Sequence, residues 1–118
     1  VYASSLAVAG IPLPPLIDEM VMTLGECVEV AAYGFPSTEE LGANVVTGLG
    51  QRQAVLMKNH GVVGVGSTVA EALRVCELVE RLSHIYVIAT QLGAAHPLPP
   101  DIVKLETDLF YMRHSTQA

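Results

Sequence analysis

Positive charge is scarce in this sequence. Its 118 residues contain six Lys and Arg against twelve Asp and Glu, which gives a formal net charge of −6 at pH 7. Proteins that bind nucleic acids neutralise the phosphates with clustered Lys and Arg side chains. The composition therefore argues against a nucleic-acid partner. The hydrophobic content of 51% argues against a disordered chain and is enough for one domain with its own core.

Long apolar runs are also missing. No stretch of about 18 residues is both apolar and free of charge, as a membrane-spanning helix requires. The opening residues, VYASSLAVAG, carry no basic segment of the kind that begins a secretory signal peptide. We therefore expect no membrane partner and a cytoplasmic location.

Cysteine and the common catalytic motifs are equally sparse. The two cysteines, Cys27 and Cys76, do not form a CxxC pair, so reduced and buried thiols are the simplest interpretation. Such thiols fit the reducing cytoplasm. The sequence also lacks HExxH, a complete GxGxxG fingerprint, a phosphate loop with its lysine, and GxSxG. A catalytic site has to be inferred from other features.

What is present is an alternation of helices and short strands. Residues 18–24 are ambiguous and are compatible with a short helix, whereas the other elements have clearer patterns. We expect further helices over residues 3–9, 38–49, 69–92 and 101–112, and strands over residues 26–33, 54–58 and 62–66. The short spacing between the last two strands predicts a hairpin. The pattern predicts a layered α/β domain with a partly antiparallel sheet.

Two of the helices have sequence signals at their start. Ser37 with Glu40 and Thr68 with Glu71 read as capping boxes, in which the first residue of each pair is the N-cap. The second of these helices ends at Gly93. Its predicted apolar stripe consists of Val69, Leu73, Cys76, Val79, Leu82, Tyr86 and Ala89.

His60 is the most informative of the four histidines. It stands between Asn59 and Gly61, which tolerate left-handed backbone conformations and suit the tip of a hairpin. A residue fixed between two strands is held rigidly, which suits a metal ligand or a catalytic imidazole. The spacing alone favours a structural alternative, in which the imidazole bonds to a backbone carbonyl.

The other three histidines suggest no ligand set. We expect His84 to be a solvated helix residue, His96 to lie in a loop before a proline, and His114 to belong to a disordered polar tail. A metal such as zinc needs three or four ligands.

The segment LMKNHGVVGVGSTVAEALRVCELVERLSHIYVIA resembles the region around the third metal-binding histidine of the class II aldolase/adducin family. This family includes sugar-phosphate aldolases, ribulose-phosphate 4-epimerases and related decarboxylases. AYGFPSTEELGANVVTGLGQRQAVLMKNHG resembles the preceding stretch of the family, and YASSLAVAGIPLPPL resembles the helix and Pro-rich loop after its His-x-His motif. The resemblance extends to about Arg113.

The resemblance implies a three-layer α/β/α fold around a mostly antiparallel sheet. It also implies a divalent metal, such as zinc, that is bound by three histidines near a glutamate. His60 matches the third of these histidines, and the His-x-His pair would fall just before Val1. Residues 1–118 would thus be the C-terminal portion of a single domain that is truncated or processed at its N-terminus.

Tyr111 is a candidate catalytic residue by the same resemblance. Many aldolases of the family carry a tyrosine near the C-terminus that reaches a neighbouring subunit's site, and a partly buried aromatic on the last helix is the alternative. The family also implies a homo-oligomer, for example a tetramer. Asp18 or Glu19 stands where some members have a tyrosine proton donor. This departure points away from fuculose-phosphate aldolases and toward the epimerase, aldolase and decarboxylase branch.

The expected function is that of the C-terminal part of a metal-dependent enzyme. The resemblance implies aldol cleavage, epimerisation or decarboxylation of a small sugar-like or sugar-phosphate substrate. Because only one metal ligand is present, we expect the 118-residue chain alone to be inactive. One alternative is an adducin-like binding module without a catalytic metal. Another is a partner chain that supplies the missing half.

Overall fold

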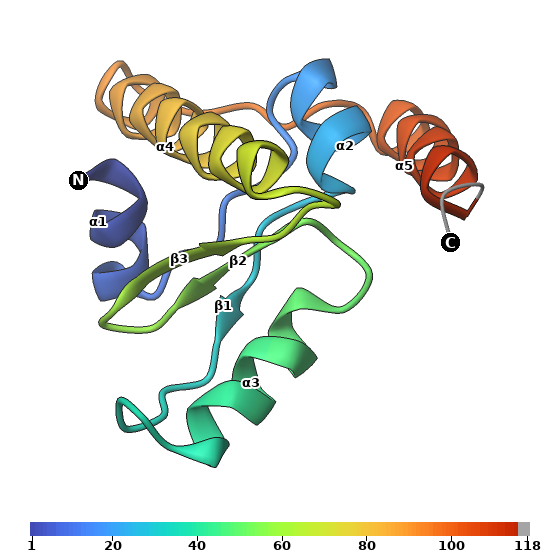
Figure 1. The fold of residues 1–118 in the computed structure, drawn as a ribbon. Coiled ribbons are helices and arrows are strands. Elements are labelled where there is room, and N and C mark those ends of the chain that lie inside the picture. The colour runs from blue at the N-terminus through green and yellow to red at the C-terminus, as the bar shows by residue number, and fades with distance from the viewer. Residues whose placement is uncertain (116–118) are drawn as a thin grey trace.

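The computed structural model describes residues 1–115, which form a small sheet with helices on both faces (Figure 1). The helices of this part are α1 (Tyr2–Ala9), α2 (Asp18–Leu24), α3 (Glu39–Leu49), α4 (Val69–Gln91) and α5 (Pro100–Ser115). The strands are β1 (Val30–Ala31), β2 (Ala54–Met57) and β3 (Gly61–Gly64). Helices α1 and α4 pack on one face of the sheet and α3 packs on the other. The expected layered α/β architecture is therefore confirmed.

The sheet is mixed, so the expectation of a mostly antiparallel sheet is wrong for the described residues. The strand order is β1-β2-β3. β1 runs parallel to β2, with Ala31 opposite Met57, whereas β2 and β3 form the predicted antiparallel hairpin. The parallel pair arises because α3 carries the chain from the end of β1 back to the start of β2.

The start of α3 differs from the predicted capping box. Thr38, not Ser37, is the N-cap: its Oγ1 accepts a hydrogen bond of 3.2 Å from the N–H of Leu41. Thr38 has an extended backbone, which aims the side chain at the first turn, whereas Ser37 has a left-handed φ of 67°. The N-cap predicted for the long helix is confirmed, since Thr68 Oγ1 accepts from the N–H of Glu71 at 3.1 Å.

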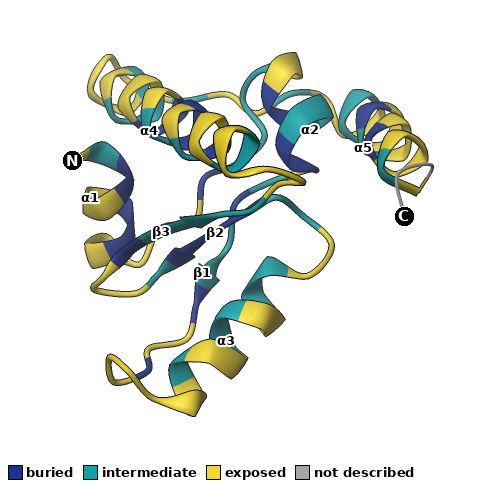
Figure 2. Cartoon of the chain, in the orientation of Figure 1, coloured by how far each residue is buried: buried dark blue, intermediate teal, exposed yellow. Residues whose placement is uncertain are grey.

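The core lies between the sheet and the helices α1, α2 and α4 (Figure 2). The predicted stripe of α4 is partly wrong, because Val69 and Leu73 are exposed. The helix has a second set of apolar positions, and packing against α1, α2 and the sheet selects that set. The buried residues of α4 are Val75, Leu78, Val79, Leu82 and Ser83.

The C-terminal helix extends further than the sequence predicts. His114, expected in a disordered tail, belongs to α5. Its Nδ1 donates a hydrogen bond of 2.8 Å to the carbonyl oxygen of Phe110, and the two rings lie 4.0 Å apart. The rest of the expected tail, residues 116–118, lies outside the described residues. No helix within residues 1–115 is long and apolar enough to cross a membrane.

Candidate metal site at one end of the sheet

His60 lies on the tight turn that joins β2 to β3. The turn closes with a hydrogen bond of 2.9 Å from the N–H of His60 to the carbonyl oxygen of Met57. Asn59 has a left-handed φ of 61°, as its place at the hairpin tip predicts. The side chain of His60 is exposed, and no carbonyl within residues 1–115 accepts a hydrogen bond from it. The imidazole is therefore available to a ligand.

Helix α1 supports this turn from one side. The N–H of Asn59 donates a hydrogen bond of 3.2 Å to the carbonyl oxygen of Ala7. Gly61 is buried, and a Cβ atom at this position would lie 3.8 Å from Ser4 Oγ. The turn that carries His60 is thus packed against α1, and its backbone is hydrogen-bonded to that helix.

The segment after β1 leaves the sheet at the same edge as the turn of His60, because β1 and β2 are parallel (Figure 1). This segment carries two exposed aromatic side chains, Tyr33 and Phe35, which are 53% and 68% exposed. No sequence motif marked them as candidates. Aromatic residues on both sides of a glycine and next to a proline are the signal that could have found them.

The backbone of this aromatic segment is braced by α3. Asn44 Nδ2 donates hydrogen bonds to the carbonyl oxygens of Ala32 and Tyr33, each 3.2 Å long. A Cβ atom at Gly34 would lie 2.6 Å from the Cα of Leu41, so only glycine allows this approach. The backbone that carries the two exposed aromatic rings is therefore held in place at the edge of the sheet where the imidazole of His60 is exposed.

His60 fits a metal as a single ligand. A neutral imidazole nitrogen is an ordinary ligand of zinc and of several other divalent ions. However, residues 1–115 contain no group of three or more His, Cys, Asp or Glu side chains that could hold a metal ion. His84 stacks on Tyr2 instead, with ring centroids 3.9 Å apart. Within residues 1–115, His60 is therefore a candidate for a single metal ligand and not part of a complete ligand set.

The two cysteines form no disulfide within residues 1–115, and Cys27 is not an activated nucleophile. Both are free and half-buried. Burial, and then a hydrogen bond of 3.1 Å to Glu29 Oε1, raise the pKa of the Cys27 thiol from 9.0 to about 12. The thiol of Cys27 therefore stays protonated at neutral pH, whereas a reactive cysteine needs a lowered pKa.

Tyr111 lies far from His60 within one chain. It belongs to α5, which packs against α2 at the other end of the molecule from the hairpin turn (Figure 1). The Tyr111 side chain is 36% exposed, and its ring meets that of Phe110 edge-on at 5.4 Å. The structure does not bring the two candidate residues of one chain together.

Comparison with known proteins identifies the family. Residues 1–87 match the family described as "Class II Aldolase and Adducin N-terminal domain", and the chain belongs to this family. It is 28% identical over 100 residues to the 5-methylthioribulose-1-phosphate/5-deoxyribulose-1-phosphate aldolase of Rhodospirillum rubrum. It is 30% identical over 100 residues to the 5-deoxy-D-ribulose 1-phosphate aldolase of Bacillus thuringiensis. Each match covers 85% of this chain, with 45% of the first relative and 46% of the second.

A solved structure supports the same assignment. An L-fuculose 1-phosphate aldolase matches with a TM-score of 0.86 and 32% sequence identity, covering 94% of this chain and 52% of that one. The chain therefore spans about half the length of the relatives that it matches. The relatives differ in their named substrates, so the similarity defines the family but not the reaction.

Proposed function

We propose that this chain is part of a metal-dependent class II aldolase that acts on a sugar phosphate, with His60 as one metal ligand. The observation that carries the proposal is the exposed imidazole of His60, on a turn braced by α1 at the edge of the sheet where Tyr33 and Phe35 emerge. Membership of the family and the names of the relatives add support.

A bound divalent metal, for which zinc is our first choice, would polarise the carbonyl and hydroxyl oxygens of the substrate. This chain would help to hold the ion through a ring nitrogen of His60, which the hairpin turn presents to solvent. Tyr33 and Phe35 would cover one side of the substrate and keep water from it. The remaining ligands would come from residues outside this chain. Residues 1–118 would then be the C-terminal portion of the domain that contains the complete site.

Aldol cleavage is the favoured reaction because the named relatives are aldolases of phosphorylated sugars. Epimerisation and decarboxylation begin with the same activation of a carbonyl compound and are the alternatives within the family. We further propose that the enzyme is a cytoplasmic homo-oligomer, such as a tetramer. In that arrangement, Tyr111 would act at the site of a neighbouring subunit, since α5 lies far from His60 in its own chain.

The test is His60→Ala in the complete gene product, with metal content and aldol cleavage as the readouts. Removal of a residue that hydrogen-bonds to a metal ligand weakens metal binding by about 10- to 100-fold. Removal of the ligand itself should therefore weaken metal binding by at least about a hundredfold. His96→Ala, in an exposed loop, is the matched control and should change neither readout. A polypeptide of residues 1–118 alone is expected to be inactive. Full metal content and activity in His60→Ala would refute the proposal.

An adducin-like binding module is the second candidate. It is favoured by the lack of a complete ligand set within residues 1–115. It predicts that the complete gene product binds no metal at His60 and that His60→Ala has no effect on metal content. The same experiment therefore separates the two candidates.

A further inference from the structure

Helix α1 has no side-chain cap of its own at its N-terminus. It is only two turns long, and its N-cap position is Val1, whose side chain accepts no hydrogen bond. The first N–H groups and last carbonyl groups of any helix need partners from outside the helix. In α1, groups at both ends find partners that are distant in the sequence.

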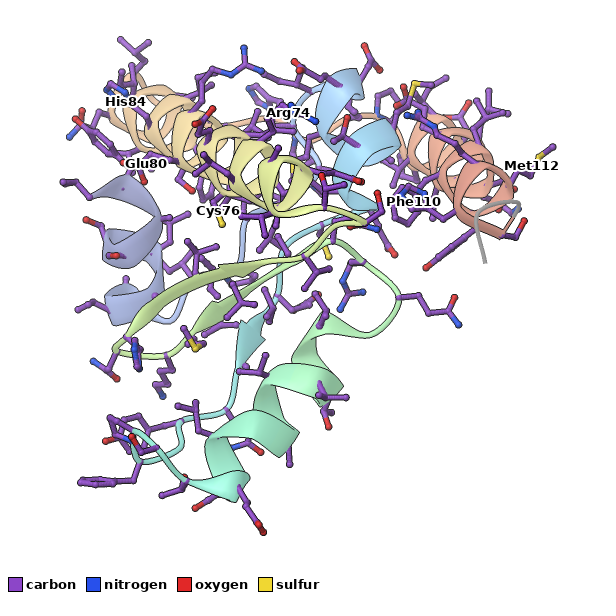
Figure 3. The ribbon with its side chains drawn as sticks, viewed as in Figure 1. Arg74, Cys76, Glu80, His84, Phe110 and Met112 are labelled. Atoms are coloured by element: carbon purple, nitrogen blue, oxygen red, sulfur yellow. The ribbon has the colours of Figure 1, made fainter. Side chains whose placement is uncertain are left out.

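The N-terminal end of α1 is bound by α4. Glu80 Oε2 accepts a hydrogen bond of 3.0 Å from the N–H of Tyr2, and Glu80 Oε1 accepts one of 2.9 Å from the N–H of Ala3. The ring of His84, one turn further along α4, stacks on the ring of Tyr2 with an interplanar angle of 9°. Figure 3 shows Glu80 and His84 over this end of α1. We call these two side chains the α4 clamp.

The charge of Glu80 suits this position. Burial of the carboxyl opposes ionisation, but the N–H groups of Ala3 and Tyr2, together with the Val1 ammonium group at 3.0 Å, outweigh it and lower the pKa of Glu80. A carboxylate at the N-terminus of a helix is also favoured by the helix dipole. The contact is thus a charge-assisted one that persists at neutral pH.

Helix α1 meets the turn of His60 at two places along its length. The carbonyl oxygen of Ala7 accepts the N–H of Asn59, and Ser4 lies beside Gly61. Helix α1 otherwise packs against α4, β2 and β3. A short helix is stiff along its axis. The α4 clamp at the N-terminal end of α1 therefore also fixes the position of the Ala7 carbonyl group near its C-terminal end.

We propose that Glu80 and His84 are positioning residues for His60. They act through α1, which serves as a strut, that is, a rigid support between α4 and the turn of His60. The inference rests on the proposed function insofar as His60 is a metal ligand. Functional groups must be held within about 0.5 Å of their productive geometry, and packing of the supporting backbone provides this. Loss of the clamp lets α1 shift, and the turn that depends on Ala7 shifts with it.

The first experiment measures amide hydrogen exchange by NMR, which needs no metal. In Glu80→Ala, the amide of Asn59 should exchange at least about tenfold faster, because local opening then costs less free energy. The amide of Leu56, which donates to the carbonyl of Glu29 at 2.8 Å in the sheet, is the reference for global unfolding. The matched control is Glu77→Ala, because Glu77 is an exposed glutamate about one helical turn before Glu80 on α4. It should change neither amide.

Two further variants keep the test decisive if Glu80→Ala folds poorly. Glu80→Gln keeps one side-chain acceptor and should restore part of the protection of Asn59. His84→Ala removes only the ring that stacks on Tyr2 and should raise the exchange of Asn59 by less than Glu80→Ala does. Unchanged exchange of Asn59 relative to Leu56 in both Glu80 variants would overturn the inference.

The second experiment measures zinc binding to the complete gene product by titration. Glu80→Ala should weaken binding by about tenfold, the lower end of the range for partners that orient a ligand, and Glu80→Gln should recover part of it. Glu77→Ala should bind as the parent does. If His60→Ala leaves zinc binding intact, the proposed function fails, whereas faster exchange of Asn59 would still support the strut. If zinc binding needs His60 but is the same in Glu80→Ala and Glu77→Ala, the positioning role fails alone.

Discussion

Glu106 is the residue whose charge the fold accommodates least well. It lies on α5, which packs against α2, and it is only 7% exposed. Its Oε1 atom has no hydrogen-bond partner within residues 1–115. Burial first, and then the hydrogen bond and negative charge of Asp18, raise the pKa of Glu106 above its ordinary value of 4.5. The folded protein therefore holds this proton more tightly than the unfolded chain does.

This difference predicts that Glu106 destabilises the fold at neutral pH. Its favourable contribution is complete below pH 4.5 and is lost as the pH rises through the raised pKa of the folded state. Glu106→Gln should thus increase the free energy of unfolding at pH 7 by on the order of 1 kcal/mol, and the gain should shrink toward pH 4.5. Urea denaturation over this pH range measures it. Glu40→Gln, at an exposed carboxyl on α3, is the control, and an equal gain there would contradict the explanation.

At the scale of whole elements, α3 shows how closely a helix approaches the sheet. None of its residues is fully buried, yet it packs on β1 and β2. The approach is made at Gly48, where a Cβ atom would lie 3.0 Å from both Ala31 Cβ and Val55 Cγ2. At Gly42, one and a half turns earlier, a Cβ atom would meet nothing within 4 Å.

The two glycines should therefore respond in opposite ways to the same substitution. Gly42→Ala is expected to raise the free energy of unfolding by about 0.5–1 kcal/mol, because alanine is the better helix former. Gly48→Ala brings the same gain in propensity but forces α3 away from Ala31 and Val55, so we expect a net loss of about 1–3 kcal/mol. Thermal and denaturant unfolding of both variants provide the measurement. A gain in Gly48→Ala would show that α3 does not depend on this contact.

The elements also show which parts of the fold are predictable from the sequence. Local signals were sufficient for the hairpin and for the helix end at Gly10, whose φ is 69°, but they left residues 18–24, which form α2, ambiguous. The buried face of α4 was not predictable, because the helix has two sets of apolar positions and only its packing partners select one. The parallel pairing of β1 depends on the path of α3, which no local pattern encodes.

The candidate site was predictable to a similar degree. His60 was found because the Asn-His-Gly triplet resembles a family motif and because turn residues flank it. Tyr33 and Phe35 were missed, since loop aromatics have no periodicity and their closeness to the His60 edge follows only from the parallel register of β1 and β2. The clamp residues Glu80 and His84 were missed because α1 and α4 are far apart in sequence.

At the scale of the whole molecule, α5 presents apolar side chains to solvent. Leu105, Leu109 and Met112 are 57%, 41% and 65% exposed, and Figure 3 shows Met112 pointing away from the rest of the fold. The same helix buries Glu106 and Phe110. An apolar stripe on the outer side of a helix is typical of a surface that another protein surface covers.

We therefore expect the 118-residue chain to self-associate at micromolar concentrations. Leu109→Lys should shift the population toward monomer, because it places a charge within the apolar stripe of α5. Light scattering coupled to size-exclusion chromatography measures the molar mass. Val46→Lys, at a 70% exposed position on α3, is the matched control. A monomeric parent, or an equal effect of both substitutions, would contradict the role of α5.

The double attachment of α1 also bears on the order in which the chain folds during synthesis. An isolated helix shorter than about 12–15 residues is marginal in water, and α1 has 8 residues. The hydrogen-bond partner of Ala7, Asn59, lies more than fifty residues further along the chain. The partner of Ala3, Glu80, lies more than seventy residues further along. Helix α1 therefore leaves the ribosome well before its partners do, and it can become stable only after about half of α4 has been translated.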